Sequence, residues 1–272
     1  MQEYDLNDLL FIFNLSKSCY YYHLNRIDKD KDLKDKILQI FETNKSRYGY
    51  RRIDISLRNN GFIVNHKKIL RLMQELNIKA KTKKRSKYNS YKGEVGKIAD
   101  NIIHRDFKTN KPYNKLFTDV TEFKIGEDKI YLSPIIDSYN FEILSYNIST
   151  SPNLMQTFDM LDKLYKILPD NLNYKTHLHS DQGWQYQHKG YQKSLKEHNI
   201  IQSMSRKGNC LDNCIIEGFF GKLKNEFYYG VEFKSIEEFI TKLGQYIEYY
   251  NYKRIKTALH TSPVDYRLRN AV

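Results

Sequence analysis

The stretch LFTDVTEFKIGEDKIYLSPIIDSYNFEILSYNIS, residues 116–149, decides the fold class of this 272-residue chain. Three runs rich in β-branched and aromatic residues lie within it: 116–125, 129–137 and 141–149. Short polar turns at 126–128 and 138–140 separate these runs, and such turns connect consecutive antiparallel strands. The pattern therefore predicts an antiparallel meander of three strands.

Helical and extended segments alternate after this meander. They are a helix at 153–168, a strand at 176–181, a helix near 190–198, a strand at 200–203, a long helix at about 212–229 and a last helix from 235 to about 250. The strand at 176–181 follows a helix, so we expect it to run parallel to the first strand. The sum is an α/β domain with a mixed five-stranded sheet and helices on both faces.

The first 80 residues have helical periodicity instead. Two amphipathic helices are predicted at 51–61 and 66–76, with Asn65 as the N-cap of the second. Two helices joined by a short turn that contains Gly61 resemble a helix-turn-helix, although most such pairs are ordinary helical hairpins.

Charge indicates the class of partner. The formal net charge is +13, from 45 Lys and Arg against 32 Asp and Glu, and such an excess suits a polyanion such as nucleic acid. A basic surface exposed only to solvent is the alternative. The segment 81–100 is basic, polar and almost free of large aliphatic residues, which predicts a linker that lies along DNA.

Hydropathy, the N-terminal pattern and the cysteines argue against a membrane protein, a secreted protein and a disulfide-stabilised fold. No apolar run approaches the roughly 18–20 residues needed to cross a bilayer. The first residues show no signal-peptide pattern, which predicts a cytoplasmic protein without a membrane partner. The three cysteines, Cys19, Cys210 and Cys214, are too scattered for a disulfide framework.

Three acids stand where chemistry can use them. Asp119 is expected in the middle of the first strand, where an unpaired carboxylate is costly. Asp181 ends the 176–181 strand, and Glu217 is early in the long helix. Clustered carboxylates repel one another and favour a hard cation such as Mg²⁺ or Mn²⁺. From spacing alone, three ordinary surface acids or helix caps remain the more frequent explanation.

Three motifs that contain these acids resemble a known family. TDVTEF (118–123), HSDQG (179–183) and SMSRKGNCLDNCIIEGFFGKLKNEF (203–227) are similar to the signatures of DDE transposases in the insertion-sequence family numbered three, which are related to retroviral integrases. The 35 residues between Asp181 and Glu217 match the spacing in that family.

Segments outside the acidic motifs extend the resemblance over nearly the whole chain. NYKRIKTALHTSP (251–263) is similar to the family's C-terminal motif. RYGYRRI (47–53) and KKILRLMQEL (67–76) resemble its upstream helical DNA-binding segment. Cys214 departs from the family, which has a small residue such as Ala at that position.

The resemblance implies a fold and a division of the chain. It implies a ribonuclease-H-like catalytic core at 113–230, after a helix-turn-helix-like DNA-binding region at 1–80 and a basic linker at 81–112. A C-terminal helical extension covers 231–272.

The resemblance also implies a chemistry. The enzyme would cleave DNA strands at the ends of an insertion sequence and join the freed 3′ hydroxyl to target DNA. Asp119, Asp181 and Glu217 are the implied catalytic residues and the ligands of two Mg²⁺ or Mn²⁺ ions, with Asp119 bridging both. Implied partners are the element ends, the target DNA, further copies of the chain, and an upstream-frame product joined by frameshifting, all in the bacterial cytoplasm at the nucleoid.

Basic and polar residues around the acids and in the helical region are the candidates for DNA contact. Lys224 lies seven residues after Glu217, which places both on one helix face. The predicted DNA-contact residues are Lys224, Arg206, Lys207, Asn209, Asn213, Arg51, Arg52, Lys83, Lys84 and Arg85. The alternatives are a solvated lysine, a mobile loop at 206–209 and, for Asn213, a helix cap.

Two other functions compete with transposition. A DNA-binding regulator derived from a transposase needs no catalytic acids, and a ribonuclease-H-like nuclease cuts without joining. All three acids are intact, which argues against the regulator. The upstream helical region and the 35-residue spacing favour a transposase over a simple nuclease.

Overall fold

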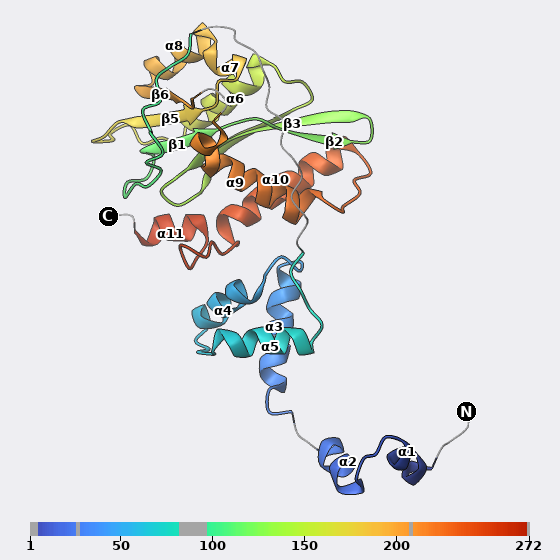
Figure 1. Ribbon diagram of the computed structural model, residues 1–272. Coiled ribbons are helices and arrows are strands. Elements are labelled where there is room, and N and C mark those ends of the chain that lie inside the picture. Colours follow the sequence, from blue (N-terminus) through green and yellow to red (C-terminus); the bar gives the residue numbers. More distant parts are fainter. Residues whose placement is uncertain (1–4, 26–27, 82–96, 207–208, 271–272) are drawn as a thin grey trace.

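The protein has three parts along the chain (Figure 1). The computed structural model describes residues 5–25, 28–81, 97–206 and 209–270. Two short helices, α1 (Leu6–Ile12) and α2 (Lys17–Leu24), stand apart from the rest, a bundle of three helices follows, and a larger α/β body contains the sheet (Figure 1). Within the described ranges, no helix is long and apolar enough to span a membrane.

The α/β body is built on one mixed sheet. Its strands are β1 (Lys115–Thr118), β2 (Thr121–Ile125), β3 (Asp128–Asp137), β4 (Ile143–Ser149), β5 (Thr176–Ser180) and β6 (Ile200–Met204). Strand β3 pairs antiparallel with β1, β2 and β4, while β5 runs parallel to both β1 and β6. The predicted meander and the predicted parallel strand are therefore confirmed.

The first predicted strand, 116–125, is wrong as a continuous element because it breaks between β1 and β2. The register against β3 continues across the break, from Thr118 opposite Ile135 to Thr121 opposite Leu132, so Asp119 stands opposite Pro134. Proline has no N–H to donate to a neighbouring strand. Asp119 consequently lies in a gap of the ladder rather than in the middle of a strand, and the sheet keeps the five strand positions that were predicted.

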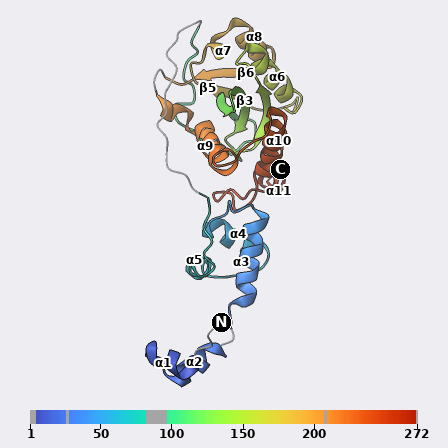
Figure 2. The same ribbon diagram turned by 90° about the vertical axis from the view of Figure 1, so that its right-hand side faces the viewer.

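Helices cover both faces of the sheet (Figures 1 and 2). On one face lie α6 (Leu154–Tyr165), α7 (Trp184–Gln187) and α8 (Lys189–Glu197), and on the other lie α9 (Cys214–Leu223) and α10 (Ile236–Tyr252). Neighbouring strand residues serve opposite cores: Leu116 packs with the α6 and α8 side, and Phe117 packs with the α9 and α10 side. This alternation is the period-two pattern of a sheet buried on both faces.

The long helix predicted at 212–229 is three helical pieces in sequence. A 3₁₀ turn spans Cys210–Asn213, α9 follows, and a π-helical turn spans Lys224–Tyr228. The π turn is closed by the N–H of Tyr229, which donates to the carbonyl of Lys224 at 2.8 Å. A π turn is wider than an α turn, and it changes the direction of the side chains that follow it.

The upstream bundle contains α3 (Lys31–Thr43), α4 (Tyr50–Asn59) and α5 (His66–Glu75). The Asn65 side chain caps α5 by accepting a backbone N–H at 2.8 Å, and Gly61, with φ +83°, follows the end of α4. Both features confirm the prediction. The bundle has its own core, made of Ile37, Phe41, Tyr48, Ile53, Ile55, Leu57, Ile69, Leu72, Met73 and Ile255.

The C-terminal part closes the body. Ser235 accepts the N–H of Glu238 at 3.1 Å and begins α10, as its capping sequence predicted. The final helix, α11 (Pro263–Arg269), is tied to the sheet by Arg267, whose Nε donates to Glu142 Oε2 at 2.7 Å. The chain after 230 is thus packed onto the α/β body.

Phe239 and Ile240 are neighbours on α10 in opposite environments. Phe239 is fully buried against the rings of Phe123 and Phe227, whereas Ile240 is 36% exposed. We expect Phe239→Ala to lower the free energy of unfolding by about 3–5 kcal/mol because it leaves a cavity. Ile240→Ala should cost less than about 1 kcal/mol. Urea unfolding measures both, and equal losses would contradict this packing of α10.

Candidate active site

Two of the three acids meet through the parallel pairing of β1 and β5. In this register Phe117 stands opposite His179. Two residues further along each strand come Asp119 and Asp181, so both carboxylates leave the carboxyl ends of adjacent parallel strands at the same level. Side chains at the carboxyl ends of such strands commonly form the site of an open α/β sheet.

Local hydrogen bonds hold both carboxylates by one oxygen. Oδ1 of Asp119 accepts the N–H of Val120 at 2.7 Å, and Oδ1 of Asp181 accepts the N–H of Gly183 at 2.9 Å. The Oδ2 atoms accept no hydrogen bond from any residue that the structure describes. Each acid therefore offers a second oxygen to a ligand.

Glu217 comes from the opposite layer. It lies in the first turn of α9, which packs on β1. Its neighbour Ile216 is fully buried in the core, which fixes the start of the helix against the sheet. The third acid therefore approaches the two strand ends from the face covered by α9 and α10.

The pKa values show that the three carboxylates share one electrostatic environment. Burial raises the pKa of Asp119 well above 3.8, and the charges of Asp181 and Glu217 raise it further. Burial also raises the pKa of Asp181, and burial together with the charge of Asp181 raises the pKa of Glu217. Burial and neighbouring charge therefore both disfavour the fully ionised set, and added positive charge would offset that cost.

The donor set fits a hard divalent cation. It consists of carboxylate oxygens without a soft sulfur ligand, which is the chemistry that Mg²⁺ and Mn²⁺ prefer. Within the described ranges, no group of three His, Cys, Asp or Glu side chains is close enough to hold a metal ion together.

Comparison with known proteins gives the family. The HTH-like domain matches residues 28–86, and the integrase core domain matches 109–210 and 217–270. The chain is 47% identical over 272 residues to the putative transposase InsK for insertion sequence element IS150 of Escherichia coli K12, covering 98% of this chain and 94% of that protein. The chain belongs to the insertion-sequence transposases with an integrase core domain.

Other proteins are also similar to this chain. An uncharacterized transposase-like protein of Haemophilus influenzae is 50% identical over 208 residues, covering 76% of this transposase and 94% of that protein. Among solved structures, the simian T-cell lymphotropic virus intasome in complex with PP2A regulatory subunit B56 gamma aligns at 14% identity with a TM-score of 0.48. That alignment covers 79% of this chain and 73% of the other. The integrase core domain and the 47% identity to the InsK transposase make the transposase an enzyme of the DDE polynucleotidyl transferase class.

Lys224 lies beside the acids of the transposase. Its ammonium is 5.5 Å from the centroid of the Phe123 ring, at the start of the π turn. Burial lowers the pKa of Lys224, while the charges of Glu122 and Asp119 oppose that shift. Lys224 is thus a partly buried cation at the edge of the acidic group.

Arg206 is held in an ion pair before α9. It donates twice to Asp212, from Nε to Oδ2 and from Nη2 to Oδ1, both at 2.9 Å. Arg105, which the sequence did not indicate, donates to the same carboxylate at 2.7 Å and to Asn209 Oδ1 at 2.8 Å. Asp212 therefore holds the side chains of Arg105 and Arg206 close together. The hydrogen bond from Arg206 is the main cause that lowers the pKa of Asp212.

The remaining predicted contact residues fall into different environments. Arg51 is exposed on α4 with its guanidinium 5.4 Å from the Tyr50 ring centroid. Arg52 is paired with Glu226 at 3.2 Å at the junction with the body, and its contact with DNA stays a prediction. Asn213 is buried, and its Oδ1 has no partner among the described residues. Four others lie outside the described residues: Lys207, Lys83, Lys84 and Arg85.

Two buried residues accompany the acids: Tyr186, which the sequence did not indicate, and His179, which belongs to the HSDQG motif. Tyr186 of α7 is fully buried, and burial followed by the charges of Asp119 and Asp181 raises its pKa well above 10. His179 is fully buried, its Nδ1 is 2.8 Å from Ser203 Oγ, and burial lowers its pKa to about 4. The Tyr186 hydroxyl and the His179 imidazole are therefore both uncharged at neutral pH. Only the position of Tyr186 shortly after the HSDQG motif signals it in the sequence.

The raised pKa of Asp119 predicts a stability that depends on pH. Below 3.8, the ordinary pKa, the acid is protonated both folded and unfolded, and its burial costs little. As pH rises, the unfolded chain ionises first, so the folded state loses stability. We expect Asp119→Asn to be more stable than the wild type at pH 7 in EDTA, with the gap closing as pH falls toward 3.8. Urea unfolding with Glu127→Gln as control measures this, and a less stable Asp119→Asn at pH 7 would contradict it.

Proposed function

We propose that this transposase cleaves DNA strands at the ends of its insertion sequence and transfers the freed 3′ hydroxyl to target DNA. The observation that carries the proposal is that Asp119 and Asp181 follow the carboxyl ends of the parallel strands β1 and β5, and that the charges of Asp181 and Glu217 both act on Asp119. The family assignment supports it, because the matching relatives are named as insertion-sequence transposases. The predicted division into 1–80, 81–112, 113–230 and 231–272 is part of this proposal.

The three acids would hold two Mg²⁺ or Mn²⁺ ions. When bound, such ions activate an attacking oxygen and stabilise the leaving oxygen in phosphoryl transfer. The free Oδ2 atoms of Asp119 and Asp181 are the first ligand atoms, and Glu217 supplies the third carboxylate from α9. Tyr186 and the apolar core behind the acids exclude water from the protein side of the site.

The basic residues would position the DNA. Lys224, beside Asp119, is placed to contact the phosphate next to the scissile bond. Arg206 and Arg105, which both form ion pairs with Asp212, would contact phosphates further along the DNA strand. Phosphate contacts position a duplex without reading its sequence, so they suit both the element ends and any target.

Further partners complete the proposal. We expect several copies of the chain to act together on DNA, because two element ends must be joined to one target. The product of an upstream reading frame, joined by frameshifting, would add recognition of the ends. The proposed place of action is the nucleoid in the bacterial cytoplasm.

Loss of any one active-site acid should abolish catalysis. We expect Asp119→Asn, Asp181→Asn and Glu217→Gln each to reduce cleavage and strand transfer by at least about 100-fold, because neutral amides hold a divalent cation poorly. Binding of duplex DNA should be retained, since it depends on Lys and Arg. An assay with a matched end oligonucleotide and Mn²⁺ measures cleavage and joining separately.

Thermal stability gives a second readout that does not need activity. Mg²⁺ should raise the melting temperature of the wild type and of the control Glu127→Gln, whose side chain is 96% exposed. The same ion should leave Asp119→Asn unshifted. Robust cleavage by any of the three variants, or equal Mg²⁺ stabilisation of all proteins, would refute the assignment.

DNA affinity should fall steeply with salt. Lysines and arginines release counterions from phosphates, so roughly six to ten contacts would lower the affinity by about 10³- to 10⁵-fold between 50 and 200 mM salt. Replacing Lys83, Lys84 and Arg85 with Ala should make the slope shallower. The matched control replaces three exposed lysines of α8: Lys189, Lys193 and Lys196. Titrations by fluorescence anisotropy measure the slopes, and identical slopes for both triple variants would exclude the linker as a DNA contact.

A further inference from the structure

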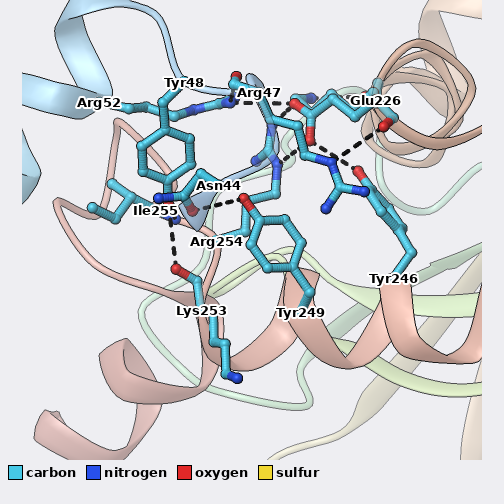
Figure 3. Close-up of polar contacts among 12 residues, drawn as sticks. Asn44, Arg47, Tyr48, Arg52, Glu226, Tyr246, Tyr249, Lys253, Arg254 and Ile255 are labelled. Carbon is cyan, nitrogen blue, oxygen red and sulfur yellow. Dashed lines mark hydrogen bonds and ion pairs between the residues drawn. The ribbon is translucent and has the colours of Figure 1, made fainter. Parts of the chain in front are cut away.

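Glu226 lies in the π turn after α9 and receives hydrogen bonds from three separate parts of the chain (Figure 3). Arg254 donates from Nε to Oε2 at 2.8 Å and from Nη2 to Oε1 at 2.6 Å. Arg52 of α4 donates from Nη1 to Oε1 at 3.2 Å, and the Tyr246 hydroxyl of α10 donates to Oε2 at 3.1 Å. Each carboxylate oxygen is therefore paired twice.

This carboxylate is ionised although it is largely enclosed. Burial raises the pKa of Glu226, but the hydrogen bonds and charges of Arg254 and Arg52 outweigh burial and hold the pKa below its ordinary range. The Arg254 side chain is only 1% exposed. Removing one member of such a pair leaves a buried charge without its partner, so the contact constrains both of the segments that it joins.

The helical bundle contacts the same turn through Arg47. Its Nε donates to the backbone carbonyl of Glu226 at 3.2 Å. Its guanidinium lies 5.1 Å and 4.8 Å from the ring centroids of Tyr246 and Tyr249 on α10 (Figure 3). Arg52 also donates to the Arg47 carbonyl at 3.1 Å, which keeps the two arginines in register. Together they fasten the bundle to the π turn and to α10.

Further contacts fix the position of the bundle relative to the α/β body. The Tyr48 hydroxyl donates to the Lys253 carbonyl at 3.3 Å and accepts the Ile255 N–H at 2.8 Å. Ile255, although it follows α10, packs in the core of the bundle. Asn44 Oδ1 accepts the Tyr249 hydroxyl at 3.1 Å. A shift of the bundle relative to the body must therefore break directional contacts around Glu226.

The turn that carries Glu226 also carries active-site residues. Lys224 is two residues before it in the same π turn, and Glu217 lies nine residues before it at the start of α9. The N–H of Tyr229 closes this turn on the Lys224 carbonyl at 2.8 Å. Displacing Glu226 therefore displaces Lys224 directly and loosens the end of the helix that presents Glu217.

We propose that Glu226 is a positioning residue that couples the helix-turn-helix-like bundle to the active site. Arg52 and Arg47 fasten the bundle to the π turn, and the π turn sets Lys224 and Glu217 against the two strand acids. When the bundle binds DNA, its position relative to the body therefore affects the positions of Lys224 and Glu217 in the active site. This inference rests on the proposed strand-transfer function, because Glu226 itself touches none of the three acids in the described contacts.

The test removes the cross-domain bond and leaves Arg254 in place. Arg52→Gln deletes the ion pair between the bundle and Glu226, and Arg52→Lys restores the charge. Arg58→Gln is the matched control, because Arg58 is on the same helix and pairs at 3.0 Å with Asp54 of its own turn. The measurements are the strand-transfer rate at saturating pre-cut end DNA, the affinity for non-specific duplex, and amide hydrogen exchange of residues 217–229.

We expect Arg52→Gln to slow strand transfer by about fivefold or more and to speed amide exchange in 217–229. The duplex affinity should be unchanged, because the Arg52 guanidinium is paired within the protein. Arg52→Lys should recover most of the rate, and Arg58→Gln should match the wild type. Equal rates and equal exchange for Arg52→Gln and Arg58→Gln would overturn the proposal.

The experiment separates this inference from the proposed function. If the wild type joins no ends, the proposed function fails, while hydrogen exchange still reports whether Arg52 controls the π turn. If the wild type is active and Arg52→Gln loses duplex affinity in step with rate, Arg52 is a DNA contact and the coupling is refuted. A loss of rate with intact affinity, restored by lysine, supports the coupling.

Discussion

The parallel pairing of β1 with β5 is the constraint on which the active site depends. It sets Asp119 and Asp181 side by side at the carboxyl ends of two strands, and α9 can add Glu217 only because it packs on β1. Pro134 opposite Asp119 leaves a gap in the antiparallel ladder at that level. Asp119 therefore lies at a break in the regular hydrogen-bond ladder of the sheet, where a ligand can approach.

The two ends of α9, the helix that carries Glu217, lie in opposite electrostatic environments. At its start, burial raises the pKa values of the three acids, and the charge of Asp181 raises those of Asp119 and Glu217 further, which favours a bound cation. After its last turn, one acid, Glu226, is held by Arg254 and Arg52 and stays ionised. The first arrangement is costly without a metal and suits catalysis, whereas the second is satisfied within the protein and suits mechanical attachment.

This arrangement connects DNA binding with chemistry. The helical bundle has a core of its own, yet Ile255 from beyond α10 completes it, and Tyr48 and Arg47 bond to the body. A contact that carries the position of the bundle to the π turn at Lys224 provides a physical route for that connection.

The sequence by itself determined the meander, the parallel strand at 176–181, and the caps at Asn65 and Ser235, because these depend on local periodicity and short-range hydrogen bonds. Motif spacing also marked the three acids as the candidates for catalysis. Only the tertiary structure decided the break at Asp119, the π turn, the burial of Tyr186 and the bonding of Arg52 to Glu226. Two of these involve partners from separate segments: Pro134 stands opposite Asp119 across the sheet, and Arg52 bonds to Glu226 from another part of the chain. A pattern along one segment carries no information about which distant partner will meet it, and that pairing is settled when the sheet and helices pack.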